Sequence, residues 1–177
     1  MNNPSAAADA LSPSLIWACS KNKDLQRGTR IHNELQKRGL VDKNYSDALA
    51  TMYAKCGELQ KAQALLDKHN SSYIVPWTAL IAAYSREGKS QQALDCFGQM
   101  QRNSIFPNEA TYVCILKACA STGAIDKGKE VHDEISRQGL LKHHIVLGGA
   151  LVHMYAKCGA LCQAQSVLEK LPSCKKY

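Results

Sequence analysis

The hexapeptide MYAKCG occurs at residues 52–57 and again at residues 154–159, an offset of 102 residues. The sequence that follows each copy also corresponds, with GELQKAQ at residues 57–63 matching GALCQAQ at residues 159–165. Internal similarity over this length is typical of proteins that stack copies of one small structural unit. The chain is therefore expected to be a repeat protein.

The offset divides into shorter units, each marked by a residue suited to a tight turn. These turn positions are Gly57, Gly88, Gly123 and Gly159, with Lys23 in the equivalent place of the first unit. Leu49 and Tyr53 are four residues apart before one turn, so they share a helix face, and the small Ala62 after it lets a second helix approach closely. Each unit is therefore predicted to be an antiparallel helix pair. The pairs must stack, because one pair cannot bury its apolar face alone.

This pattern predicts an all-α protein of about five helix-turn-helix units. After an N-terminal tail at residues 1–8, the units are expected at residues 9–42, 43–73, 74–108, 109–144 and 145–175. Asn108 is placed to cap the helix that begins at Glu109, because a side-chain oxygen at this position can accept a hydrogen bond from the free N–H groups of the first turn.

The composition favours a reduced protein with a polyanionic partner. The chain has 22 Lys and Arg against 15 Asp and Glu, a formal net charge of +7, which suits nucleic acid. Several of the eight cysteines lie in apolar helical stretches, which indicates buried thiols rather than disulfides. The longest uncharged stretch, residues 70–85, contains Pro76 and polar residues, so we expect no membrane span. The first 20 residues contain no Lys or Arg, so no import signal is expected there.

The unit pattern resembles the pentatricopeptide repeat family, and closely its plant PLS class, in which long, short and standard units alternate. The stretch from Trp77-Thr78-Ala79-Leu80-Ile81 to Pro107-Asn108 is similar to a standard unit. Residues 52–57 and 154–159 look like parts of short units, and residues 115–132 look like part of a long unit. The resemblance implies a right-handed α-solenoid.

The resemblance also implies sequence-selective binding of single-stranded RNA, with one base read per repeat by two or three side chains. The reading residues are the fifth and the last of each unit, and the second residue of a unit wedges against the base. In the standard unit the reading residues are Thr78 and Asn108, which by the resemblance imply adenine, and the wedge is Val75. Ala110 and Val146 are the wedges of the next two units.

The remaining reading positions depart from this pattern and are expected to read weakly or not at all. They are Pro13, Asp47, Val113 and Gly149 as fifth residues, and Tyr73 and His144 as last residues. A stacked base contributes about 1–3 kcal/mol, whereas micromolar affinity needs about 8 kcal/mol. The sequence therefore predicts weak RNA binding by this chain alone, or a piece of a longer array.

No catalytic or cofactor site is predicted. Arrays of the PLS class often end in a deaminase domain, whose His-x-Glu and Pro-Cys-x-x-Cys motifs are absent from this sequence. The resemblance therefore implies an organellar RNA-processing or RNA-editing targeting factor, chloroplastic or mitochondrial, served by a deaminase-bearing or other processing protein in trans. Cys158 and Cys162 lie one helical turn apart, but Gln60 stands at the equivalent of Cys162 in the earlier copy, so packing is favoured over metal binding.

A protein-interaction scaffold remains the alternative, because a helical solenoid offers a concave surface that suits peptides as well as RNA. The distribution of Lys and Arg discriminates between the two. Basic residues on the face of Thr78 and Asn108 favour RNA, and a scatter over the convex side favours the scaffold. Self-association is also expected to be possible, because both ends of a short stack expose apolar faces.

Overall fold

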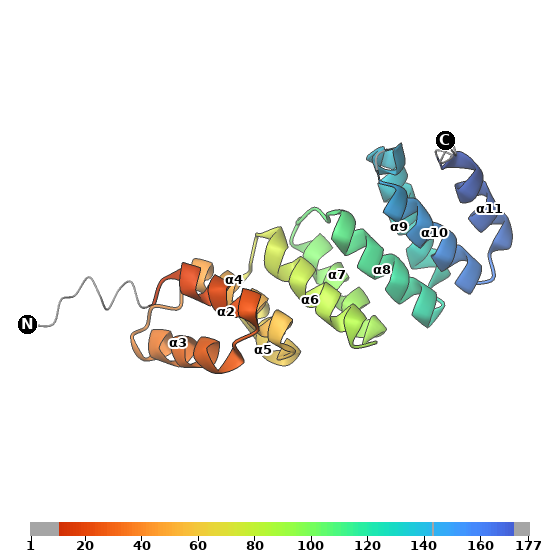
Figure 1. Ribbon diagram of the computed structural model, residues 1–177. Coiled ribbons are helices and arrows are strands. Elements are labelled where there is room, and N and C mark those ends of the chain that lie inside the picture. The colour runs from red at the N-terminus through yellow and green to blue at the C-terminus, as the bar shows by residue number, and fades with distance from the viewer. Residues whose placement is uncertain (1–10, 143, 172–177) are drawn as a thin grey trace, which may run out of the picture.

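The computed structural model describes residues 11–142 and 144–171, and all regular secondary structure within them is helical. The helices form five successive pairs, which follow one another along a single elongated stack (Figure 1). The pairs are α2 (Pro13–Asn22) with α3 (Leu25–Lys37), α4 (Lys43–Cys56) with α5 (Leu59–His69), α6 (Ile74–Arg86) with α7 (Ser90–Arg102), α8 (Glu109–Thr122) with α9 (Ile125–Arg137), and α10 (Ile145–Lys157) with α11 (Leu161–Lys170). A short 3-10 helix, η1 (Leu140–Lys142), precedes α10. The predicted all-α solenoid of helix-turn-helix units is confirmed. The predicted tail at residues 1–8 lies outside the described residues.

The turns between paired helices use left-handed backbone, as the glycine positions predict. Gly57 has φ 89°, and the next N–H, of Glu58, donates a hydrogen bond of 2.9 Å to the carbonyl of Tyr53. Lys23 adopts the same conformation with φ 53°, although a side chain disfavours it. At the other end of a helix, Asn108 caps α8 as predicted, its Oδ1 accepting from the N–H of Thr111 at 2.9 Å.

The helices form an inner and an outer row. The first helices of the pairs, α2, α4, α6, α8 and α10, each contact the next of their kind. The second helices, α3, α5, α7, α9 and α11, pack mainly against first helices, and α7 also makes side-chain hydrogen bonds to its outer neighbours, between Gln63 and Gln99 and between Lys127 and Gln101. The first helices therefore form a continuous inner row of the solenoid. The first turns of successive pairs lie along one face of this row.

Small residues allow the outer helices to pack closely against the inner helices, as the sequence pattern predicts. Ala62 and Ala93 are fully buried on outer helices. At Gly28 a Cβ would lie 2.6 Å from the Cε of Met52, and at Gly128 it would lie equally close to Met154. Met52 and Met154 therefore fill the space beside these glycines, and the two glycine–methionine pairs pack in the same way.

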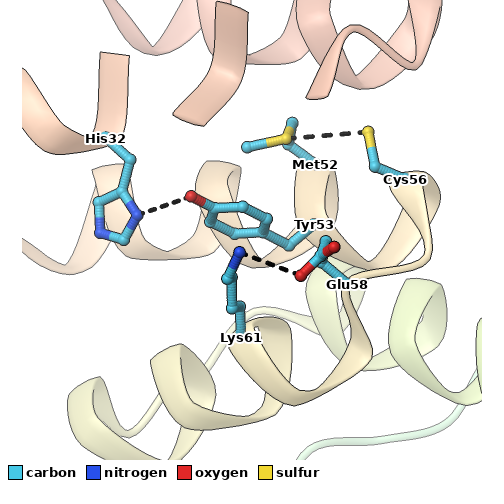
Figure 2. A network of polar contacts seen from close by, with 6 residues as sticks. All are labelled: His32, Met52, Tyr53, Cys56, Glu58 and Lys61. Carbon is cyan, nitrogen blue, oxygen red and sulfur yellow. Dashed lines mark hydrogen bonds and ion pairs between the residues drawn. The ribbon is translucent and has the colours of Figure 1, made fainter. Parts of the chain in front are cut away.

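A histidine–tyrosine contact also joins the first helix pair to the second, and it recurs between the fourth pair and the fifth. The Nδ1 of His32 on α3 lies 2.9 Å from the hydroxyl of Tyr53 on α4 (Figure 2). His132 on α9 and Tyr155 on α10 repeat this distance, with the two rings edge-on in both pairs. In the first copy Lys61 lies 5.6 Å from the centre of the Tyr53 ring. Polar contacts therefore fix the angle between neighbouring pairs in addition to the apolar core.

Candidate nucleic-acid interface along the inner helices

The structure brings Thr78 and Asn108 together through a third residue, Thr111. Thr78 lies on α6, Asn108 precedes α8, and Thr111 is fully buried between them. The Oγ1 of Thr111 lies 2.9 Å from the Oγ1 of Thr78 and 2.9 Å from the Oδ1 of Asn108. The two predicted reading residues therefore share one polar cluster, across the boundary between neighbouring pairs.

The hydrogen-bond directions in this cluster follow from one fixed donor. The backbone N–H of Thr111 can only donate, so the Asn108 atom that it faces is the carbonyl oxygen. The hydroxyl of Thr111 donates its one proton to the same oxygen. In the contact between the two threonines, the Thr78 hydroxyl must then donate its proton and the Thr111 oxygen must accept it. Thr78 is left with acceptor lone pairs, and the exposed Asn108 is left with two N–H donors.

The predicted wedge residues all lie at the surface. Val75 is 50% exposed and Val146 is 62% exposed, unusual values for valine, and Ala110 is also exposed. Each lies in the first turn of an inner helix, α6, α8 or α10. Apolar side chains are therefore available beside each inter-pair boundary to contact a flat ligand.

The positions predicted to read weakly differ from Thr78 in their surroundings. Val113 is half-buried and packs against the core, and Gly149 is exposed with no atom within 4 Å of the place of a Cβ. The Nδ1 of His144 lies 2.8 Å from a carboxylate oxygen of Glu109, so the ring is held by a residue of the preceding inner helix. Val113 and Gly149 therefore offer no polar side-chain group, and one of the two ring nitrogens of His144 is engaged by Glu109.

Asp47 is buried rather than exposed to the groove as a reading position would be. It is only 6% exposed, and neither carboxylate oxygen has a hydrogen-bond partner. This burial raises the pKa of the carboxyl, and the nearby Ser71 and Lys43 oppose the rise. Sequence reasoning, which placed an acidic group in the groove, did not anticipate that its neighbours would enclose it.

A surface pocket of about 390 Å³ opens beside Asp47, between the first turns of α2, α4 and α6. Two aromatic side chains line it, Trp17 at 40% and Tyr73 at 57% exposure, together with Val75. Trp17 was not among the predicted site residues. Its signal in the sequence is its spacing, because it follows Pro13, a predicted fifth residue, by four positions and so shares its helix face.

Basic residues of the inner row lie on the same helix face as the wedge residues. Arg86 follows Val75 by 11 residues, and Lys157 follows Val146 by 11, which is three helical turns. Lys55 stands 11 residues after Asn44, another residue of the pocket. These three basic residues are exposed, and none of the Lys and Arg on the inner helices forms an ion pair within the described residues.

The outer row carries charge of both signs instead. The acidic residues of the inner helices are only Asp47 and Glu109, against the basic residues Lys21, Lys43, Lys55, Arg86, Lys117 and Lys157. On the outer helices eight Asp and Glu oppose ten Lys and Arg, and several are paired, as in Lys127 with Glu130 and Arg137 with Glu134. The inner helices therefore carry the larger excess of positive charge, six basic against two acidic residues, and unpaired Lys and Arg lie on both rows.

Comparison with known proteins identifies the repeat. Models of the PPR repeat match residues 14–40 and 110–140, and a model of the PPR repeat family matches residues 73–121. This chain belongs to the pentatricopeptide repeat (PPR) family. The PPR chain spans about a quarter of the length of the curated relatives that it matches.

Two such relatives come from Arabidopsis thaliana. One is a chloroplastic pentatricopeptide repeat-containing protein, 38% identical over 161 residues that cover 90% of this PPR chain and 26% of the relative. The other is a putative mitochondrial pentatricopeptide repeat-containing protein, 34% identical over 159 residues that cover 89% of this chain and 25% of the relative.

The fold also matches a solved PPR protein. The crystal structure of PPR10 in complex with an 18-nt psaJ RNA element superposes with a TM-score of 0.61 at 21% sequence identity, covering 82% of this chain and 22% of PPR10. A further crystal structure of PPR10, from maize, superposes with a TM-score of 0.54 at 20% sequence identity, covering 82% of this chain and 21% of PPR10. At this identity the match establishes the shared solenoid fold.

Across residues 11–142 and 144–171, no three His, Cys, Asp or Glu side chains lie where they could hold a metal ion together. Within the same residues, no helix has both the length and the apolar character needed to cross a membrane.

Proposed function

We propose that this PPR chain binds single-stranded RNA along its inner helices, with an adenine held by Thr78 and Asn108. The observation that carries the proposal is the polar cluster of Thr78, Thr111 and Asn108, which leaves an acceptor and a donor side by side at the boundary between two pairs. Val75 and Ala110 flank this cluster from the first turns of α6 and α8.

The chemistry of the cluster suits the Watson–Crick edge of adenine. The N6 amino group of the base donates to Thr78, and its N1 accepts from the amide of Asn108. The choice of adenine among the four bases comes from the family resemblance of this pair of residues, since one acceptor and one donor leave other bases a possible pairing. The flanking apolar side chains add contact with the face of the base.

The basic residues supply the phosphate contacts. Lys55, Arg86 and Lys157 lie unpaired on the wedge face, on α4, α6 and α10. Counterion release by such contacts makes affinity fall with salt, by about 0.7 in log K per log unit of salt for each phosphate of a single strand. This distribution supports RNA over the protein-interaction scaffold, which does not require unpaired charge on the inner face.

The wider role that we propose is that of an organellar RNA-processing or RNA-editing targeting factor of the PLS class, without catalysis of its own. The chloroplastic and mitochondrial names of relatives support an organelle. A deaminase-bearing or other processing protein acting in trans would supply the chemistry.

Thr78→Val tests the base-reading claim, because it removes the hydroxyl and keeps the shape of the side chain. In low salt, we expect fluorescence anisotropy to show tighter binding of a uridine oligonucleotide that contains adenine than of one without it. The variant should reduce this preference by about tenfold, the effect of losing about 1.4 kcal/mol. Ser136→Ala, on the outer helix α9, serves as the control. Equal binding of both oligonucleotides by the unmodified chain would contradict the proposal.

A further inference from the structure

Four of the described cysteines form two equivalent pairs on the inner helices. Cys19 lies on α2 and Cys56 ends α4, and their counterparts 100 and 102 residues later are Cys119 on α8 and Cys158, which directly follows α10. In each pair the first thiol is buried and the second is half-buried. Each pair spans two inner helices that contact one another, α2 with α4 and α8 with α10. The repeat therefore places two thiols at each of these boundaries between helix pairs.

In the second of these cysteine pairs, one thiol reaches the backbone of the other residue. The Sγ of Cys158 lies 3.8 Å from the carbonyl oxygen of Cys119. In the first pair the Sγ of Cys56 instead faces the Sδ of Met52 on its own helix, at 3.9 Å (Figure 2). Burial, and after it the neighbouring Cys158 thiol, raises the pKa of Cys119 to about 11, so the two sulfurs are close enough to interact. The second pair therefore has the proximity that a disulfide requires.

The surroundings of Cys158 suit reaction with a small anionic disulfide. The side chain is half-buried, so a small molecule can reach it, whereas Cys119 is fully buried. The adjacent Lys157 is exposed and forms no ion pair within the described residues. Glutathione disulfide is negatively charged, so this lysine favours its approach. Cys158 is therefore the first thiol to react, and Cys119 is the second.

We propose that Cys119 and Cys158 form a reversible disulfide with glutathione disulfide as the oxidant. The Cys158 thiolate attacks one sulfur of glutathione disulfide, which forms a mixed disulfide and releases one glutathione. The Cys119 thiolate then attacks the Cys158 sulfur and releases the second glutathione. Two protein thiols are thereby oxidised to one disulfide, glutathione disulfide is reduced to two glutathione molecules, and these take up the two protons that the cysteines lose.

The bond strengthens the joint between the fourth and fifth helix pairs. It closes a loop of about 40 residues, which restricts the unfolded chain. It links the last turn of α8 to the end of α10, whereas Ala110 and Val146 lie in the first turns of the same helices. The disulfide therefore lies away from the proposed base contacts, and the inference does not depend on RNA binding.

The test uses the reduced full chain at low concentration, incubated in glutathione buffers of increasing disulfide content, then alkylated and digested with trypsin. We expect mass spectrometry to show residues 118–127 linked to residues 158–170, and dithiothreitol to reverse the linkage. Because the second peptide also contains Cys162, Cys158→Ser decides which thiol is linked, and this variant should lose the product. Cys56→Ser, the same change at the equivalent position of the first copy, should retain it.

Urea denaturation supplies a second measurement, made on Cys56→Ser so that the first cysteine pair cannot contribute. Oxidation should raise its urea midpoint by about 1 M, and adding Cys158→Ser should remove this rise. Absence of the linked peptide at every glutathione ratio would overturn the inference. So would a product that persists in Cys158→Ser, or one that joins two chains. An unchanged midpoint in the linked chain would show that the bond does not fit the native helices, which also overturns the proposal.

Discussion

The single hydroxyl proton of Thr111 determines what Thr78 and Asn108 present to a ligand. Because that proton is committed to Asn108, Thr78 becomes an acceptor and the Asn108 amide a donor. Neither reading residue settles this alone, since a threonine hydroxyl can donate or accept. At this scale a buried neighbour, rather than the exposed pair, sets the hydrogen-bonding character of the site.

The cysteines provide a prediction at the same scale. Burial, the largest cause, raises the pKa of Cys96 to about 12 and that of Cys119 to about 11, whereas Cys162 is exposed. The thiolate is the reactive form, and at pH 8 roughly one Cys119 thiol in a thousand is ionised. We expect iodoacetamide to modify Cys162 at least about a hundredfold faster than Cys96 or Cys119, as followed by peptide mass spectrometry. Urea should abolish the difference, and equal rates in the native chain would contradict the described burial.

At the scale of the helices, the duplicated histidine–tyrosine contact joins outer and inner rows at two places, α3 with α4 and α9 with α10. Burial is the main cause that lowers the pKa of both His32 and His132. The neutral imidazole is therefore the form that the fold favours. Protonation is expected to weaken both joints, because burial opposes the charged form of each ring.

This gives a pH dependence of stability with a definite sign. Because the folded pKa lies below the unfolded value of about 6.5, the unfolded chain binds more protons as the pH falls below that value. The stabilisation is present above pH 6.5 and is lost on acidification toward the folded pKa. We expect the urea midpoint to fall between pH 7.5 and pH 5.5, and His132→Gln to flatten that fall. His153→Gln, at an exposed position of α10, should leave it unchanged. A midpoint independent of pH would contradict this account.

At the scale of the whole molecule, the helices that follow the two copies of MYAKCG, α5 and α11, differ in how far their leucines are buried. Leu59 and Leu66 of the first copy are 3% and 1% exposed, because α6 packs against α4 and α5. Their counterparts Leu161 and Leu168 on α11 are 67% and 59% exposed. The same sequence therefore presents an apolar face at one place that it buries at the other, and we propose that this face supports self-association.

Replacing both α11 leucines tests that proposal. Full burial of a leucine contributes about 1.5–3 kcal/mol, so two of them can drive weak association at high protein concentration. We expect sedimentation velocity to show association that increases with concentration, and Leu161→Lys with Leu168→Lys to abolish it. Leu40→Lys, at a leucine that is 48% exposed on another part of the chain, is the control. A monomer at every concentration, or equal loss in the control, would refute the role of this face.

The sequence by itself determined the helix pairs, their turns and their stacking. Those features depend on residues within a few positions of one another, such as Leu49 and Tyr53 on one face and Gly57 at the turn. The same local logic predicted the Asn108 cap. The family resemblance, rather than the spacing alone, named the candidate reading positions as the fifth and last residues of each unit.

Only the tertiary structure decided the chemistry at those positions. Asp47 is buried although the sequence predicted it in the groove, Trp17 and Tyr73 line one pocket although more than 50 residues separate them, and Thr111 directs Thr78 from the next pair. Burial, pKa and hydrogen-bond direction depend on atoms that distant segments bring close, and the spacing of residues along one helix does not specify them.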